Sequence, residues 1–334
     1  MLGFVKRLLG GARNDVYGLD HLVLNVQLPP QSMWMNMGYW ESTVDFPQAC
    51  QALLDLVLTA GLLTDKGLSI RVLDVGCGCG DQSLHLIGLR KGVSLARSKS
   101  DLTTALQHRS SAESQRPVPL VDTYIGITLE PAQAALAQSR IGGARSHLEK
   151  SSVQMSAGIF RADASDPSSW SGDLLNSITK LATSCGENDT STWLLALDTM
   201  YHFRPSRLPL LQYARSTLQA SLMAFDLILA DGVTRREHFI LRIVCWLTGS
   251  PLSNFITRDE YLSMLVAAGY DPSRIEIRDV SRHVFTGLSS FLGGRIKEAQ
   301  PYGMKMGKFR AAKMVFGWWA RSGVVRGVVV VARR

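Results

Sequence analysis

Residues 72–81 read VLDVGCGCGD, and this stretch decides the fold class. Residues 70–75 form a short apolar run with β-branched side chains, which is typical of a buried strand. The run leads directly into the alternate glycines Gly76, Gly78 and Gly80. Glycines allow a sharp turn and let a ligand come close to the backbone. The pattern therefore predicts a ligand site at the carboxyl end of a strand in an open α/β sheet.

The remainder of the chain alternates between strand-like and helical patterns. Further strands are predicted at 123–127, 153–160, 192–198, 224–230, 274–280 and 327–332. Helices are predicted at 48–62, 82–89, 131–145, 171–183, 206–221 and 257–269. This alternation predicts parallel β-α-β units in a doubly wound, seven-stranded, mostly parallel sheet with helices on both faces.

The sequence also indicates how the chain is divided. Residues 1–65 are expected to form an N-terminal cap with lead-in helices, and residues 66–334 the domain that contains the sheet. Insertions are expected at about 90–120, 235–256 and 282–322. The first is rich in Ser, Arg and Gln and is interpreted as a surface insertion. The other two are expected to pack over the open edge of the sheet as a helical lid.

Composition and charge exclude several classes of protein. With 46% hydrophobic and 19% charged residues, the 334-residue chain has the profile of a folded globular protein, so extensive disorder is excluded. The net charge of +8 is concentrated in residues 295–334, which carry ten basic groups and one acid. A basic tail on a neutral body is weak evidence for nucleic-acid binding.

The cysteines and the apolar runs bear on the compartment. The five cysteines form no C-x-x-C pair, which argues against a disulfide framework or a structural zinc site and favours a reducing compartment. No apolar run approaches the roughly 18–20 residues needed to cross a bilayer, and the N-terminus has no apolar core of a secretory signal. A cytoplasmic location is therefore expected.

The glycine loop does not fit a nicotinamide-dinucleotide site. That site requires G-x-G-x-x-G, whereas here the spacing is G-x-G-x-G and Asp81 occupies the sixth position. A pyrophosphate beside Asp81 would be repelled. The acids Asp74 and Asp81 suit a ligand that bears an ammonium or a sulfonium group.

The full string of hydrophobic residues, Asp74 and alternate glycines resembles motif I of the class I S-adenosylmethionine-dependent methyltransferases. Residues 124–133 (YIGITLEPAQ) resemble the second-strand motif, in the form familiar from the small-molecule and lipid subgroup of cyclopropane-fatty-acid synthases, mycolic-acid and tocopherol-type enzymes. The resemblance spans about residues 31–280. It implies a Rossmann-like fold and S-adenosyl-L-methionine as cofactor.

The resemblance also implies a set of cofactor contacts. By it, Thr128, Leu129 and Gln133 line the ribose and adenine, although most class I members have an acid at the position of Thr128, and Glu130 is a candidate replacement. Asp163 and Ala164 match the third-strand adenine motif. The complete set is Tyr39, Asp74, Gly76, Gly78, Gly80, Asp81, Gln82, Thr128, Leu129, Gln133, Asp163, Ala164 and Asp198.

Simpler interpretations of some of these residues stay open. Tyr39 belongs to an aromatic segment, residues 32–41, that resembles a pocket-closing element of the same subgroup, yet its aromatic residues could equally pack the lid. Gln133 fits an exposed residue in the first turn of a helix, and Asp163 fits an ordinary turn.

The candidate catalytic residues follow the fourth strand. Methyl transfer from a sulfonium requires alignment and exclusion of water and no metal, while an oxygen or nitrogen acceptor also benefits from a general base. His202 is the candidate base or positioning residue, and Tyr201 the candidate substrate contact. Cyclopropane synthases resemble this region but carry Glu-His here, so Tyr201 makes cyclopropanation the less favoured reaction. A purely structural His202 is the alternative.

The function predicted from these features is methylation of an oxygen, nitrogen or carbon of a hydrophobic small molecule, as in secondary metabolism. Aromatic residues of the insertions supply an apolar cap: Phe239, Trp246, Phe255, Phe285 and Phe291. Internal packing of the cap is the plain alternative for these residues.

Three other functions are alternatives. A membrane-associated lipid or sterol methyltransferase is suggested by residues 305–326, where Lys and Arg alternate with aromatic residues, although these aromatic residues could equally pack inside. Nucleic-acid methylation is disfavoured because no N-P-P-Y or D-P-P-Y tetrapeptide follows the fourth strand. A regulator that binds the cofactor without turnover is the last. The acceptor atom and the oligomeric state stay open.

Overall fold

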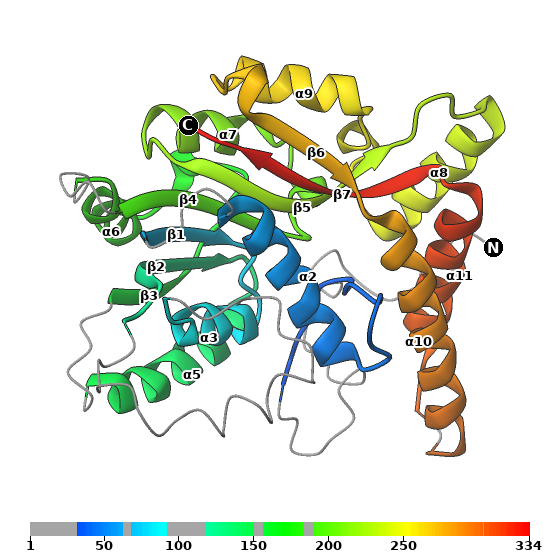
Figure 1. The fold of residues 1–334 in the computed structure, drawn as a ribbon. Coiled ribbons are helices and arrows are strands. Elements are labelled where there is room, and N and C mark those ends of the chain that lie inside the picture. Colours follow the sequence, from blue (N-terminus) through cyan, green and yellow to red (C-terminus); the bar gives the residue numbers. More distant parts are fainter. Residues whose placement is uncertain (1–31, 63–67, 92–117, 150–155, 184–189, 303) are drawn as a thin grey trace, which may run out of the picture.

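The computed structural model describes residues 32–62, 68–91, 118–149, 156–183, 190–302 and 304–334. Within these residues the chain forms one seven-stranded sheet with helices on both faces (Figure 1). The strands are β1 (Ser69–Val75), β2 (Val121–Thr128), β3 (Ser156–Arg161), β4 (Thr190–Leu197), β5 (Ser221–Leu229), β6 (Ile275–Asp279) and β7 (Val325–Ala332).

The strand order is β3-β2-β1-β4-β5-β7-β6. Strands β1 to β5 are mutually parallel, and β7 runs antiparallel between β5 and β6. The chain order reverses between β1 and β4, which is where a ligand is expected in an open α/β sheet. The predicted doubly wound, seven-stranded and mostly parallel sheet is confirmed.

Nine helices flank the sheet in the described residues. They are α2 (Phe46–Leu62), α3 (Asp81–Gly88), α5 (Pro131–Glu149), α6 (Gly172–Thr183), α7 (Leu208–Ser216), α8 (Arg235–Thr248), α9 (Arg258–Ala267), α10 (Phe285–Ala299) and α11 (Gly307–Ser322). Figure 1 shows α8, α10 and α11 grouped beyond the carboxyl end of β5. None of the described helices is long and apolar enough to cross a membrane.

The core lies in two layers because successive side chains of a strand point to opposite faces. Val72 of β1 joins the cluster that contains Leu53 of α2, whereas its neighbour Leu73 joins the cluster that contains Leu174 of α6. From Ile70 onward β1 is buried on both faces, as expected for a central parallel strand.

Most element boundaries lie within a few residues of the prediction, with one instructive difference. Helix α7 ends at Ser216 rather than near 221, and β5 begins at Ser221 rather than 224. Gln219 adopts a left-handed backbone with φ of 52°, which ends the helical path although the apolar pattern continues through Leu218 and Ala220. The predicted surface insertion lies mostly outside the described residues, as does the start of the strand predicted at 153–160.

Candidate active site

The glycine loop, residues 76–80, follows β1 and packs closely against Thr199 and Ala137. Gly76, Gly78 and Gly80 all have positive φ, of 82°, 57° and 88°. A Cβ on Gly76 would lie 2.7 Å from Thr199 Oγ1, and one on Gly80 would lie 3.1 Å from the Ala137 Cα. At these two positions the fold itself therefore requires glycine.

Gly78 is placed differently from its two neighbours. A Cβ built there would meet only the Met35 side chain, at 3.5 Å. The strain of a side chain would come from the left-handed backbone rather than from a collision. Gly78 is therefore the position in the loop where the backbone is most open to a ligand.

Asp74 is buried near the end of β1, just before the glycine loop. Its carboxylate accepts hydrogen bonds from Gln82 Nε2 at 2.7 and 2.9 Å and from Tyr124 Oη at 2.5 Å. Burial raises its pKa to about 6, against these hydrogen bonds, which lower it. The hydrogen bonds of Asp74 thus go to Gln82 and Tyr124, and this network connects the end of β1 to helix α3 and strand β2.

Asp81 opens helix α3 and is held in a bidentate ion pair. Arg140 donates from both terminal nitrogens, at 2.6 and 2.9 Å, and the Met33 backbone amide donates at 3.1 Å to each oxygen. The sequence predicts that the Asp81 carboxylate attracts a cationic ligand, but in the structure the Arg140 guanidinium already compensates its charge. Its direct partners are Arg140 and the segment that begins at Met33.

Residues 33–37, here called the strap, cross over the glycine loop. One end is fixed at Asp81 by Met33, and the other at Asp198, where the Met37 amide donates to Oδ2 at 2.8 Å. Between them Met35 faces Gly78 and lies 3.7 Å from Gln133 Nε2 through its sulfur. Sequence reasoning missed these contacts because methionines carry no recognisable chemical signature.

Asp198 follows β4 and combines several unusual features. Its backbone is left-handed, with φ of 61°, and its Oδ1 is buried without a hydrogen-bond partner among the described residues. Burial raises its pKa to about 8, although hydrogen bonds from Tyr201 and the Met37 amide lower it. Asp198 therefore offers an unused acceptor beside the strap.

Tyr201 and His202 lie in the short helical turn after β4. Tyr201 is buried beside Phe255, with ring centroids 6.4 Å apart. His202 is half-buried, and its Nδ1 lies 3.4 Å from Ser250 Oγ. Burial and then the charge of Arg207 lower the pKa of His202 to about 3. A neutral His202 with so low a pKa is a weak proton acceptor at neutral pH.

Tyr39 follows the strap and contacts Glu41 and His283. Its hydroxyl donates to Glu41 Oε2 at 2.8 Å, and its ring lies 5.2 Å from that of His283. Burial and the neighbouring Glu41 carboxylate raise the pKa of Tyr39 to about 12. The described contacts of Tyr39 therefore join the segment after the strap to the start of α10.

The remaining predicted cofactor residues end or follow β2 and β3, and Gln133 lies in the first turn of α5. Thr128 and Gln133 are both buried, and Thr128 Oγ1 donates to Gln133 Oε1 at 3.0 Å. Leu129 is 54% exposed. Asp163 is exposed and accepts hydrogen bonds from the amide and hydroxyl of Ser165 at 2.8 and 2.7 Å. Ala164, the next residue, is buried. Because β1 to β4 are parallel neighbours, the residues that follow them lie at one edge of the sheet.

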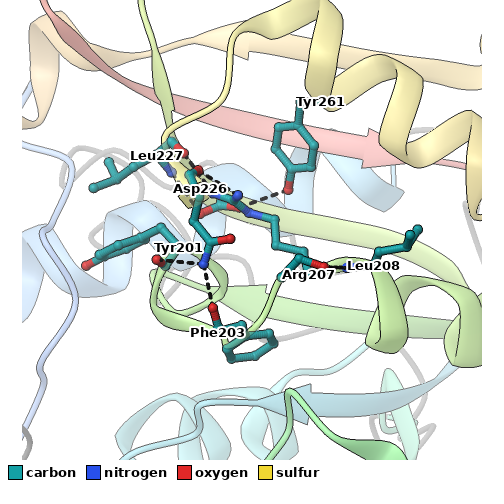
Figure 2. Close-up of polar contacts among 9 residues, drawn as sticks. Tyr201, Phe203, Arg207, Leu208, Asp226, Leu227 and Tyr261 are labelled. Atoms are coloured by element: carbon teal, nitrogen blue, oxygen red, sulfur yellow. Dashed lines mark hydrogen bonds and ion pairs between the residues drawn. The ribbon is translucent and has the colours of Figure 1, made fainter. Parts of the chain in front are cut away.

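A buried ion pair is connected to the turn that carries Tyr201, and no sequence pattern predicted it. Arg207 and Asp226 are fully buried, and the Arg207 Nε lies 2.6 Å from Asp226 Oδ2. Tyr261 donates to the same oxygen at 2.9 Å, and Arg207 donates to the carbonyl of Asn254 at 2.7 Å (Figure 2). The Asn254 amide in turn donates to the carbonyls of Tyr201 and Phe203. The network thereby fixes the turn that carries Tyr201.

Solved structures, rather than sequences, are what this chain resembles. No family model matches this chain, and no curated protein sequence matches it. Among solved structures, the cyclopropane synthase MmaA2 from Mycobacterium tuberculosis is similar over 97% of this chain and 99% of its own, with a TM-score of 0.58 and 14% identity. The chain has the class I methyltransferase fold.

Two further structures show the range of chemistry found on this class I methyltransferase fold. The (4+2)-cyclase SpnF is similar over 96% of this chain and 94% of its own, with a TM-score of 0.55 and 18% identity. Geranyl diphosphate C-methyltransferase from Streptomyces coelicolor is similar over 96% of this chain and 97% of its own, with a TM-score of 0.50 and 14% identity. That structure was solved with Mg²⁺, geranyl diphosphate and S-adenosyl-L-homocysteine. At such identities the likeness establishes the fold.

Proposed function

We propose that this protein is an enzyme that transfers a methyl group from S-adenosyl-L-methionine to a hydrophobic small molecule. The observation that carries the proposal is the glycine loop at the carboxyl end of β1, covered by the strap and flanked by Asp198. The loop lies where the strand order reverses, and its open position is Gly78.

The residues at this edge fit the proposed cofactor. The buried, unpartnered Oδ1 of Asp198 suits the ammonium of the methionine moiety, and the open backbone at Gly78 suits its close approach. Thr128 at the end of β2, Gln133 in the first turn of α5, and Asp163 and Ala164 after β3 would take the ribose and adenine. When bound, the cofactor supplies an electrophilic methyl group on a sulfonium.

The chain's own residues then align the acceptor and exclude water. The strap closes over the glycine loop, with Met33 and Met37 anchored at its two ends. Tyr201 is held by Asn254 beside Phe255 and presents an aromatic surface to an acceptor. His202 is assigned a positioning role rather than the role of a base, because its pKa is lowered to about 3.

Of the five aromatic residues predicted to cap the site, three pack on the core cluster and two are exposed. Phe255 and Phe285 are buried and reach Trp319 with ring-centroid distances of 6.2 and 5.4 Å, and Phe291 packs against the same cluster. Phe239 and Trp246, by contrast, are exposed. The neighbours named for geranyl diphosphate and for cyclopropane synthesis agree with an apolar substrate class, as in secondary metabolism.

Two subsidiary expectations belong to the same proposal. The four cysteines in the described residues are free and buried, which supports a reducing, cytoplasmic location. The division at about residue 65 assigns the lead-in helix α2 to the N-terminal cap, although it packs on the sheet through Leu53 and Leu54.

Incubation with methyl-labelled S-adenosyl-L-methionine and an extract of the native host tests this function. We expect label in the organic-soluble fraction, with mass spectrometry then identifying the acceptor. The Gly78→Val variant serves as the matched control and should transfer no label. Label confined to nucleic acid or protein would overturn the substrate class, and no transfer to any fraction would overturn the activity.

A further inference from the structure

Helix α8 presents an exposed apolar ridge to solvent. Four apolar side chains of this helix are exposed: Phe239 by 63%, Trp246 by 55%, Ile243 by 42% and Leu247 by 36%. The helix is held to the core by its opposite side, where Leu241 and Cys245 are buried. Helix α8 therefore packs on the core with one side only, and the apolar side chains of its other side are exposed.

The positions of these residues place them on one continuous face. Phe239, Ile243 and Trp246 follow at spacings of four and three residues, so they stack along one side of the helix. Arg235 and Arg242 lie beside them, four residues before Phe239 and Trp246, and Arg236 lies at the amino-terminal end of the ridge. All three arginines are exposed. An apolar ridge with arginines along one side and at one end is typical of a helix that lies in a membrane interface.

A cavity adjoins this face. It has a volume of about 540 Å³ and is lined by the β5–α8 turn, the first half of α8 and the start of α9. Leu229, Ala230 and Val233 give it an apolar floor, while Arg235, His238 and Arg242 place basic groups around it. No acidic side chain lines it among the described residues. The cavity suits a negatively charged group attached to an apolar chain.

We propose that the exposed face of α8 docks on an anionic lipid bilayer, with a lipid headgroup received by the adjoining cavity. The Phe239 and Trp246 rings would enter the interface, and the arginines would meet the phosphates and carboxylates of the headgroups. The single acid of the helix, Glu237, is turned to its cap, where Thr234 Oγ1 donates to it at 2.7 Å. The charge of the face is thus complementary to an anionic surface.

A second copy of this chain is a poorer occupant. In a two-fold symmetric contact the same patch meets itself, so Arg235 and Arg242 would face the same arginines of the other copy. No acid on α8 other than Glu237 could offset this repulsion. The arginines favour an anionic partner, and a bilayer provides one that also accepts protruding aromatic rings.

The segment 305–326, which the sequence suggested for membrane contact, is a less suitable surface. Trp319 is buried, and Phe309, Phe316 and Trp318 pack against the core cluster. Met314, exposed by 68%, is the outward apolar residue of α11. The aromatic groups of this segment are therefore buried or packed on the core, whereas Phe239 and Trp246 of α8 are exposed.

Sedimentation of the full-length protein with lipid vesicles tests the proposal without any need for turnover. Vesicles of phosphatidylcholine with about 30% phosphatidylserine should sediment the protein, and pure phosphatidylcholine vesicles should do so at least about ten-fold less. The Phe239→Ala and Trp246→Ala double variant should lower binding to the anionic vesicles by about ten-fold or more. The Arg235→Gln and Arg242→Gln double variant should lower it and weaken its dependence on salt.

The matched control is Met314→Ala on α11, which should bind the anionic vesicles as the wild type does. All substituted residues are exposed, so circular dichroism should show unchanged folding in each variant. No vesicle binding, equal binding to neutral vesicles, or an α8 double variant that binds normally would overturn the proposal. So would a loss with Met314→Ala equal to the loss with the α8 variants. Inorganic phosphate at millimolar concentration should not compete, and full competition would assign the site to a free anion instead.

Discussion

Among single residues, Asp198 has the clearest consequence for stability. Its pKa of about 8 in the folded protein lies above its ordinary value of 3.8. The folded state therefore holds this proton to higher pH than the unfolded chain, and the residue lowers stability progressively as pH rises from about 4 to about 8. Asp198→Asn removes this effect, so we expect a gain of about 1–3 kcal/mol in unfolding free energy at pH 9 that vanishes near pH 4.

The same variant separates a ligand contact from a purely structural residue. Denaturant unfolding across this pH range measures the stability, and calorimetry measures the affinity for S-adenosyl-L-homocysteine. At pH 9, where Asp198 is ionised, we expect Asp198→Asn to be more stable yet to bind at least about ten-fold more weakly, because it loses the negative charge beside the ammonium. Unchanged affinity in a stabilised variant would remove Asp198 from the cofactor site.

His202 gives a second prediction at this scale. Its lowered pKa, about 3, keeps the imidazole neutral throughout the range between about pH 5 and pH 8. We therefore expect His202→Gln to lower turnover by about ten-fold through misalignment of the acceptor, with no change in the shape of the pH–rate profile. Disappearance of a limb near pH 6–7 in the variant would show that His202 titrates there and acts as a base.

At the scale of elements, the strap and helix α3 depend on each other through Asp81. Its carboxylate accepts from Arg140 and from the Met33 amide, so Asp81→Asn should weaken both contacts. We expect the strap to open more readily by about 1–3 kcal/mol. Hydrogen exchange of the amides at 33–37, followed by mass spectrometry, measures this opening.

The control for the strap is Asp173→Asn, another acid in the first turn of a helix. It should leave exchange at 33–37 unchanged. Equal protection of these amides in Asp81→Asn and the wild type would mean that the strap is held by its other contacts, at Asp198 and Gln133, rather than by Asp81.

At the scale of the whole molecule, the Arg207–Asp226 pair joins α7, β5 and α9 beneath the active site. Removal of one partner leaves the other charge buried and unpaired, so Arg207→Met should lower the unfolding free energy by about 3–5 kcal/mol. Glu298→Gln, in the exposed pair with Arg295, should change it by about 0–1 kcal/mol. Chemical denaturation of both variants measures the contrast, and similar losses would show that the buried network carries no special share of stability.

Much of the molecule could be predicted because the decisive patterns are local. The strand expected at 70–75 is β1, Ser69–Val75, and the glycine spacing placed the loop at its end. The strap contacts could not be predicted, since Met37 and Asp198 are 161 residues apart and a methionine amide leaves no trace in a sequence. The burial of Arg207 could not be predicted either, because charged side chains are usually exposed.

The exposed face of α8 shows a related limit. Phe239 and Leu241 are both apolar and lie two residues apart, yet one is exposed and the other buried. Periodicity indicates that the helix has an apolar side, but not which apolar residues meet the core. The sequence placed Phe239 and Trp246 in a cap over the site, and the structure turns them to solvent.

The most direct test of the account is a calorimetric titration of the protein with S-adenosyl-L-homocysteine. We predict a single saturable site in the wild type, no binding in Gly78→Val, and unchanged binding in Gly143→Ala, whose added methyl group on α5 meets open space. Absence of binding to the wild type, or binding to Gly78→Val with equal affinity, would contradict the claim that the glycine loop after β1 holds this cofactor.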